Sequence, residues 1–65
     1  MKVIYNPKAD TLVLEFKQGS VVESDEDKPG TILDYDANGD IISMEILDAS
    51  KRVEDASNMQ FKVAA

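Results

Sequence analysis

Hydrophobic and polar residues alternate along much of the chain, which is the pattern of strands with one packed face and one wet face. Two such runs, over residues 2–5 and 11–16, are separated by the turn-forming segment Asn6-Pro7-Lys8-Ala9-Asp10. The pattern therefore predicts a hairpin with strands 2–5 and 11–16. Its packed face would carry the apolar residues at every second position, which are Val3, Tyr5, Leu12, Leu14 and Phe16.

A second hairpin is predicted over residues 31–35 and 41–47, because Asn38-Gly39 between two apolar runs is a strong hairpin signal. A two-residue turn at Asn38-Gly39 would set Tyr35 opposite Ile42. It would also set Leu33 opposite Met44, and Asp34 opposite Ser43 on the other face. A three-residue loop with a bulge at Gly39 would pair Tyr35 with Ile41 and mix the faces. The hydrophobic pattern favours the two-residue turn.

Three further elements complete the predicted fold. Residues 20–24 are expected to form a short edge strand, residues 50–56 a helix capped by Asp48 or Ser50, and residues 59–63 a possible last strand. A helix this short is marginal alone and must dock on the sheet. The predicted class is α+β, mainly β, with a small antiparallel sheet of two hairpins in a single domain, 1–65.

The amino-acid composition argues against several classes of function. The chain has 65 residues, no cysteine or histidine, and a formal net charge of −6. Without these two residue types, hydrolase pairs of nucleophile and base cannot be built within one chain, so we expect no enzyme. The negative charge argues against nucleic-acid binding. No signal peptide or membrane-spanning run is recognisable, so a cytoplasmic protein is expected. So small a domain often needs self-association, and we expect a dimer.

Residues 34–45 match the calcium-loop pattern of an EF-hand. Its ligand and glycine places are filled by Asp34, Asp36, Asn38, Gly39 and Glu45. An EF-hand needs a helix on each side, whereas both flanks here have strand alternation. An extended segment after Asp40 would carry Glu45 roughly 16 Å from the turn, at about 3.3 Å per residue. We therefore favour a hairpin turn without a ligand. The alternative is a weak cation site of Asp34, Asp36, Asn38 and Asp40.

The second face of the sheet is more apolar than a wet face requires. It is expected to carry Ile4, Val13, Ile32 and Ile41. The helix, a second copy of the chain or another protein could cover these residues, so they are candidate interaction residues.

Several motifs in order carry a family resemblance. They are Tyr5-Asn6-Pro7-Lys8-Ala9-Asp10-Thr11-Leu12, Val22-Glu23-Ser24, Pro29-Gly30-Thr31-Ile32-Leu33-Asp34-Tyr35-Asp36, Gly39, and Met44-Glu45-Ile46-Leu47-Asp48-Ala49-Ser50. With them the chain, from about Lys2 to Arg52, resembles the small prokaryotic family catalogued as domain of unknown function 2283. Members usually carry a small residue, often Gly, where this chain has Ser43.

The resemblance implies a small β-sheet with a short helix and supplies no catalytic residues. The resemblance also implies an antitoxin-like role with a basic protein partner, because some members are encoded beside small ribonuclease-like toxin proteins. Taken together, we expect a self-associating, non-enzymatic interaction module that needs no cofactor. The alternative is a weak calcium-binding protein that uses the acidic turn 34–40.

Overall fold

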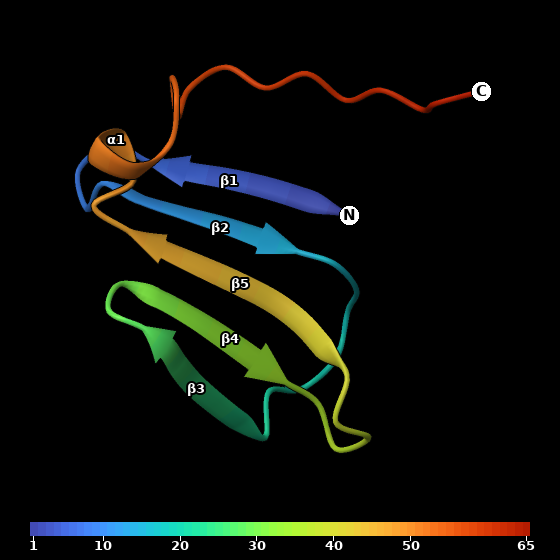
Figure 1. Ribbon diagram of the computed structural model, residues 1–65. Helices are drawn as coiled ribbons and strands as arrows, with labels where there is room; N and C mark the ends of the chain where they lie inside the picture. The colour runs from blue at the N-terminus through green and yellow to red at the C-terminus, as the bar shows by residue number, and fades with distance from the viewer.

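Five strands form one antiparallel sheet in the computed structural model, which describes residues 1–65 (Figure 1). The order across the sheet is β1-β2-β5-β4-β3, so the fifth strand lies in the centre. The strands are β1 (Lys2–Asn6), β2 (Thr11–Glu15), β3 (Glu23–Lys28), β4 (Thr31–Tyr35) and β5 (Ile41–Leu47). A single short helix, α1 (Ala49–Arg52), follows β5 at one end of the sheet.

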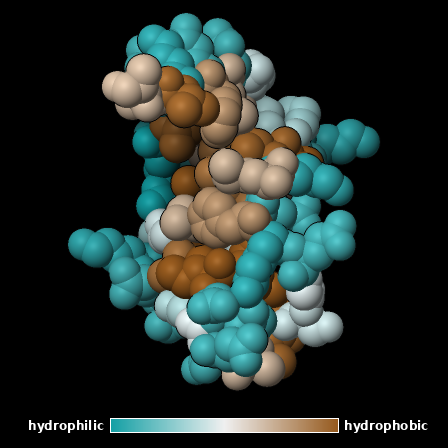
Figure 2. Space-filling view, turned by 90° about the vertical axis from the view of Figure 1, so that its right-hand side faces the viewer, coloured by the Kyte–Doolittle hydropathy of each residue, from teal (hydrophilic) through white to brown (hydrophobic).

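The register divides the sheet into two faces of different chemistry. The "apolar face" consists of two rows of cross-strand neighbours that include Val3, Leu14, Met44, Leu33, Tyr5, Leu12 and Ile46. The "polar face" consists of the alternate rows, which include Lys2, Glu15, Ser43, Asp34, Ser24, Ile4, Val13, Glu45 and Ile32. Figure 2 views the molecule from the right of Figure 1 and shows hydrophobic side chains in a band between hydrophilic margins.

The sheet is a single layer, and neither face is covered by a second layer of secondary structure (Figure 1). Only Ile42, Ala49 and Asp34 are buried, and no large side chain is fully enclosed. Apart from Ile42, the apolar residues of β1, β2, β4 and β5 are therefore only half-buried or exposed. One chain alone does not close a hydrophobic core.

The turn between β4 and β5 differs from the two-residue turn favoured by the hydrophobic pattern. The Gly39 N–H donates to the Asp36 carbonyl at 3.0 Å, and Gly39 has φ of 83°. This is a three-residue loop that ends in a left-handed glycine. Tyr35 consequently pairs with Ile41, and the expected pairing of Tyr35 with Ile42 is wrong.

A bulge explains why the two faces are nevertheless kept apart. Ile42 is the extra residue of β5, and beyond it Asp34 pairs with Ser43 and Leu33 with Met44, as predicted. The Ile42 carbonyl accepts the Phe16 N–H at 2.8 Å. The bulge restores the alternation that the longer loop would have shifted.

Three predicted elements need correction. The edge strand expected over 20–24 lies at Glu23–Lys28, where it pairs with β4 through the Pro29-Gly30 turn and makes a third hairpin. The helix expected over 50–56 ends at Arg52. Residues 59–63 form no strand. No helix of the structure is long and apolar enough to cross a membrane.

Candidate functional site

The most buried polar group of the chain lies in the middle of the polar face. Asp34 is only 5% exposed, although it is an aspartate in an otherwise open sheet. The Ser24 hydroxyl donates to Asp34 Oδ1 at 2.6 Å, and the Ser43 hydroxyl donates to Asp34 Oδ2 at 2.7 Å. The two serines come from β3 and β5, the strands on either side, so Asp34 joins three strands through side chains.

Glu45 completes this cluster from β5. Burial raises the pKa of Glu45, and so do its hydrogen bond to Asp34 and the charge of that residue. For Asp34, burial would raise the pKa, but hydrogen bonds from Ser24, Ser43 and Glu45 outweigh it and lower the pKa. The environment thus moves the two pKa values apart, that of Asp34 downward and that of Glu45 upward.

The acidic turn between β4 and β5 already holds a cation, the Lys17 ammonium group. Lys17 Nζ lies 2.9 Å from Asp36 Oδ2 and 2.9 Å from Asp40 Oδ2. The other Asp36 oxygen accepts the main-chain N–H groups of Asn38 and Asp40, at 2.9 and 3.0 Å. The hydrogen bond from Lys17 is the main cause of the lowered pKa of Asp36.

The calcium-loop residues are consequently divided between two places. Asp34 and Glu45 belong to the cluster on the polar face, whereas Asp36 and Asp40 bind Lys17 at the turn. Asn38 is exposed at the tip. No group of three or more acidic side chains converges on a common point. Lys17 had no signal in the sequence, because it lies outside the loop and reaches it only through the fold.

The predicted interaction residues are brought together in part. Ile4, Val13 and Ile32 lie in one row across the polar face, with Glu45 between Val13 and Ile32. Ile4 is 44% exposed. Ile41 lies outside this row, because the register pairs it with Tyr35 next to the bulge.

A wider hydrophobic site lies on the apolar face. Met1, Val3 and Leu14 line a groove of about 530 Å³ together with Met59 and Phe61 of the C-terminal segment. All five lining residues are hydrophobic. The signal for this segment is visible in the sequence, since Met59, Phe61 and Val63 alternate with polar residues, but these residues form no strand of this sheet.

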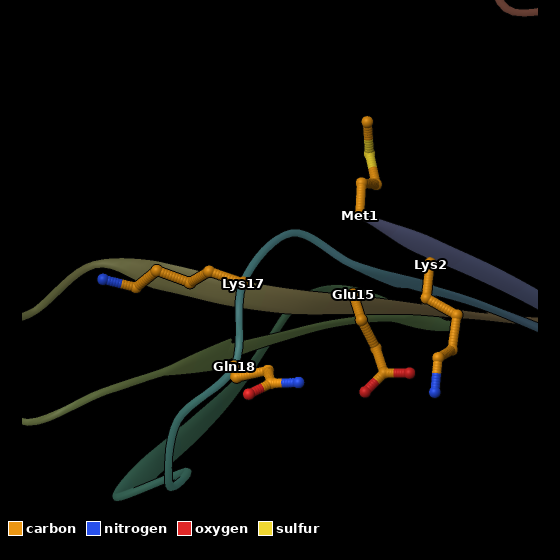
Figure 3. Close-up of a pocket in the computed structure, with 5 residues that line it drawn as sticks. All are labelled: Met1, Lys2, Glu15, Lys17 and Gln18. Carbon is orange, nitrogen blue, oxygen red and sulfur yellow. The ribbon is translucent and has the colours of Figure 1, made fainter.

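A second hollow, of about 200 Å³, lies at the end of β1 and β2 (Figure 3). Lys2 and Glu15, which are cross-strand partners, point to one side of the sheet there, and Met1 points to the other. Lys17 and Gln18 complete the lining, and Lys17 extends away toward the acidic turn. The hollow brings together charged side chains but no pair of nucleophile and base.

Asp10 connects the first hairpin to the helix. Its Oδ1 accepts the Tyr5 hydroxyl at 2.8 Å and the Ser50 main-chain N–H at 2.9 Å, and its Oδ2 accepts the Ser50 hydroxyl at 2.7 Å. Hydrogen bonds from the Ser50 hydroxyl and from Tyr5 lower the pKa of Asp10. This arrangement holds Ala49 against the sheet, where it is completely buried, and is structural in role.

Comparison with known proteins gives one match. The family model described as "Protein of unknown function (DUF2283)" matches residues 2–50. The comparisons with curated proteins and with solved structures found no match. The matched region covers all five strands and the start of α1, and residues 51–65 lie outside it.

Proposed function

Because the chain belongs to the DUF2283 family, whose function is unknown, we propose a function from its surfaces. The protein is a non-enzymatic interaction module that self-associates as a dimer through the apolar face. A basic protein is its further partner, at the acidic edge. The observation that carries the first part is the apolar face, which no second layer of secondary structure covers and in which no large side chain is fully buried.

The exposed area supports self-association quantitatively. The chain exposes 5087 Å². A compact monomer of 7.2 kDa would expose about 4,100 Å². The excess is roughly 1,000 Å², and a partner in a stable complex of ordinary size contributes about 800 Å². The chain thus exposes an additional area of the size that a dimer interface would remove from water.

The shape of the molecule fits a sheet-on-sheet dimer. Its principal extents are 34 × 33 × 19 Å, so it is a broad, thin body. Two sheets that pack face to face lie about 10 Å apart and form a common core from their inner side chains. Val3, Leu14, Met44 and Leu33 form a row across four strands, so each copy would contribute a continuous apolar layer.

The basic partner is proposed from the charge of β3. All six residues of this edge strand are exposed, and Glu23, Asp25, Glu26 and Asp27 are acidic. Together with the net charge of −6, this edge would attract a basic surface and steer its approach. An antitoxin-like role, in which the acidic edge covers the basic surface of a small ribonuclease-like protein, agrees with this charge. Pull-down with such a protein, and its loss at high salt, would test it.

Self-association is tested by sedimentation equilibrium on the full chain. Leu14→Ser changes the apolar face. Val13→Ser changes the polar face of the same strand, where the sequence placed the candidate interaction residues, and so tests which of the two faces forms the dimer. We expect Leu14→Ser to raise the dimer Kd at least about tenfold, because a buried Leu contributes about 1.5–3 kcal/mol. Val13→Ser should leave the Kd within about threefold. A wild-type chain that is still monomeric at a protein concentration of about 100 µM would overturn the proposal.

Weak calcium binding by Asp34, Asp36, Asn38 and Asp40 is the alternative. In its favour, Asp36 and Asp40 both direct an oxygen at one cation, the Lys17 ammonium group. Calcium would have to displace Lys17 from these two oxygens, and Asp34 would have to leave Ser24 and Ser43. The interaction module is therefore the better supported function.

A further inference from the structure

The C-terminal segment Met59–Val63, here called the arm, has the features of a strand without a sheet. Met59, Phe61 and Val63 alternate with Gln60 and Lys62, and the three apolar side chains are 62%, 72% and 82% exposed. The last main-chain hydrogen bond of the chain joins the Asn58 N–H to the Asp55 carbonyl, so the arm makes none. Its main-chain donors and acceptors are all available for pairing.

The sheet offers two open edges, and they differ in chemistry. β3 carries four acidic residues, and a charged edge of this kind disfavours pairing with an apolar strand. β1 has the sequence Lys-Val-Ile-Tyr-Asn, with Val3 and Tyr5 on the apolar face and only Lys2 charged. It is five residues long, as is the arm. β1 is thus the edge that suits the arm.

Within its own chain, the arm neither pairs with β1 nor buries its apolar side chains. It runs past β1 without joining the sheet (Figure 1). Met59 and Phe61 lie over Met1, Val3 and Leu14 and leave an open apolar groove of about 530 Å³ between them. Phe61 stays 72% exposed in this position. A second copy presents the same edge and the same groove.

We propose that the arm of one copy adds to β1 of a second copy as a sixth strand, with Met59, Phe61 and Val63 extending that copy's apolar face. The proposal rests on the dimer proposed above and specifies how it is held together. Exchange is reciprocal in a two-fold dimer, so two arms fill two grooves. The arm lies outside residues 2–50, the region that the family model matches.

The distances allow the exchange. The apolar face of the partner sheet would lie about 10 Å away, as in packed sheets. The segment 53–58, which connects α1 to the arm, can span roughly 20 Å when extended, at about 3.3 Å per residue. Since the arm already lies over its own apolar face, it stands on the side from which the partner approaches.

The first test compares two double variants of the full chain. Met59→Ser with Phe61→Ser removes the apolar side of the arm, and Gln60→Ser with Lys62→Ser changes only its polar side. We expect the first pair to raise the dimer Kd by about tenfold or more and the second to change it less than about threefold. An unchanged Kd in the first pair would overturn the role of the arm while leaving the dimer intact. A monomeric wild-type chain would instead end the dimer proposal.

The second test separates a second copy from the arm's own chain. In a dimer prepared from an equal mixture of ¹³C-labelled and unlabelled protein, isotope-filtered NOEs are recorded between the Phe61 ring and the Val3 and Leu14 methyl groups. Intermolecular NOEs are expected. If NOEs are found only within one chain, the arm covers its own sheet. If no NOEs are found, the arm covers neither its own sheet nor that of the partner. Both results contradict the exchange.

Discussion

Ser50 binds Asp10 twice, with its main-chain N–H at 2.9 Å and with its hydroxyl at 2.7 Å, although 40 residues separate the two. The Ala49 N–H also donates to the Asp10 carbonyl, at 2.9 Å. The turn between β1 and β2 therefore caps α1. Asp48 occupies the N-cap position, but its side chain makes no capping hydrogen bond. A helix of four residues owes its existence to this tertiary contact rather than to its own sequence.

Replacing Asp10 should loosen the helix and the first hairpin together. Asp10→Ala removes three hydrogen bonds, from Tyr5 and twice from Ser50, and places alanine at φ of 49°. We expect the Tm to fall by roughly 5–10 °C, measured by circular dichroism. Tyr5→Phe, which removes one of the three bonds, should lower the Tm less. Equal effects of the two variants would contradict the role of Asp10 as the common acceptor.

Acid should destabilise the wild-type chain through the same residue. The pKa of Asp10 is lowered by Ser50 and Tyr5 from its usual 3.8, so the folded state holds the proton less tightly than the unfolded state. Its contribution to stability is complete above the unfolded pKa and is lost as the pH falls through the folded pKa. The range from pH 5 to pH 2 brackets the ordinary aspartate pKa of about 3.9. Over this range, urea unfolding should show a steeper loss of the free energy of unfolding in wild type than in Asp10→Asn.

Ionisation of Glu45 should change stability with pH in the opposite direction from that of Asp10. Burial and Asp34 raise its pKa above the usual 4.5, so its contribution is complete below that value and is lost as the pH rises through the raised pKa. Gln at this position keeps a donor for Asp34 and cannot ionise. We expect Glu45→Gln to be more stable than wild type at neutral pH, by about 1 kcal/mol in urea unfolding. The control is Glu15→Gln, on the same face but not bonded to Asp34; a gain of equal size there would point to net charge alone.

Alanine substitutions at two glycines should distinguish the cost of backbone strain from that of a steric clash. Gly30 and Gly39 have similar φ, 82° and 83°. A Cβ at Gly30 would lie 2.7 Å from Arg52 Nη1, whereas one at Gly39 would meet nothing within 4 Å. We expect Gly39→Ala to cost about 1 kcal/mol and Gly30→Ala more, because Arg52 must also give up its bond to the Gly30 carbonyl. In an Arg52→Met background the two costs should become equal.

Lys17 should compete with any divalent cation at the acidic turn. Its ammonium group lies 2.9 Å from both Asp36 and Asp40, so Lys17→Gln frees two carboxylate oxygens and removes a repelling charge. Calcium titration followed by the Gly39 amide shift should therefore show tighter binding in Lys17→Gln than in wild type. Equal responses of the two proteins would mean that calcium, if it binds, uses other oxygens.

The sequence predicted the central part of the sheet well because its signals there are local. Strands 31–35 and 41–47 have the predicted bounds, since apolar alternation and the turn residues around Gly39 agree. The pairing of Asp34 with Ser43 was predicted from a two-residue turn, and it is found because the bulge at Ile42 offsets the longer loop. The bulge itself was not predicted, because it involves the Phe16 N–H, which donates to the Ile42 carbonyl from just beyond the end of β2.

Other elements are decided by pairing rather than by propensity. Acidic residues have low strand propensity, so the edge strand was predicted around Val21 and Val22, at residues 20–24. Pairing with β4 instead places it at Glu23–Lys28. The position of Ser24 beside Asp34 was missed for that reason. The helix ends at Arg52, which donates to the carbonyls of Gly30 and Leu47, a tertiary contact that periodicity does not reveal.

The central position of β5 also governs how the chain assembles. The hairpins β1–β2 and β3–β4 are not neighbours in the sheet, and β5 is the only strand that pairs with both. During synthesis the two hairpins can form early, but they stay unconnected until residues 41–47 have left the ribosome and inserted between them. The last strand to be made is the one that turns two marginal hairpins into one cooperative unit.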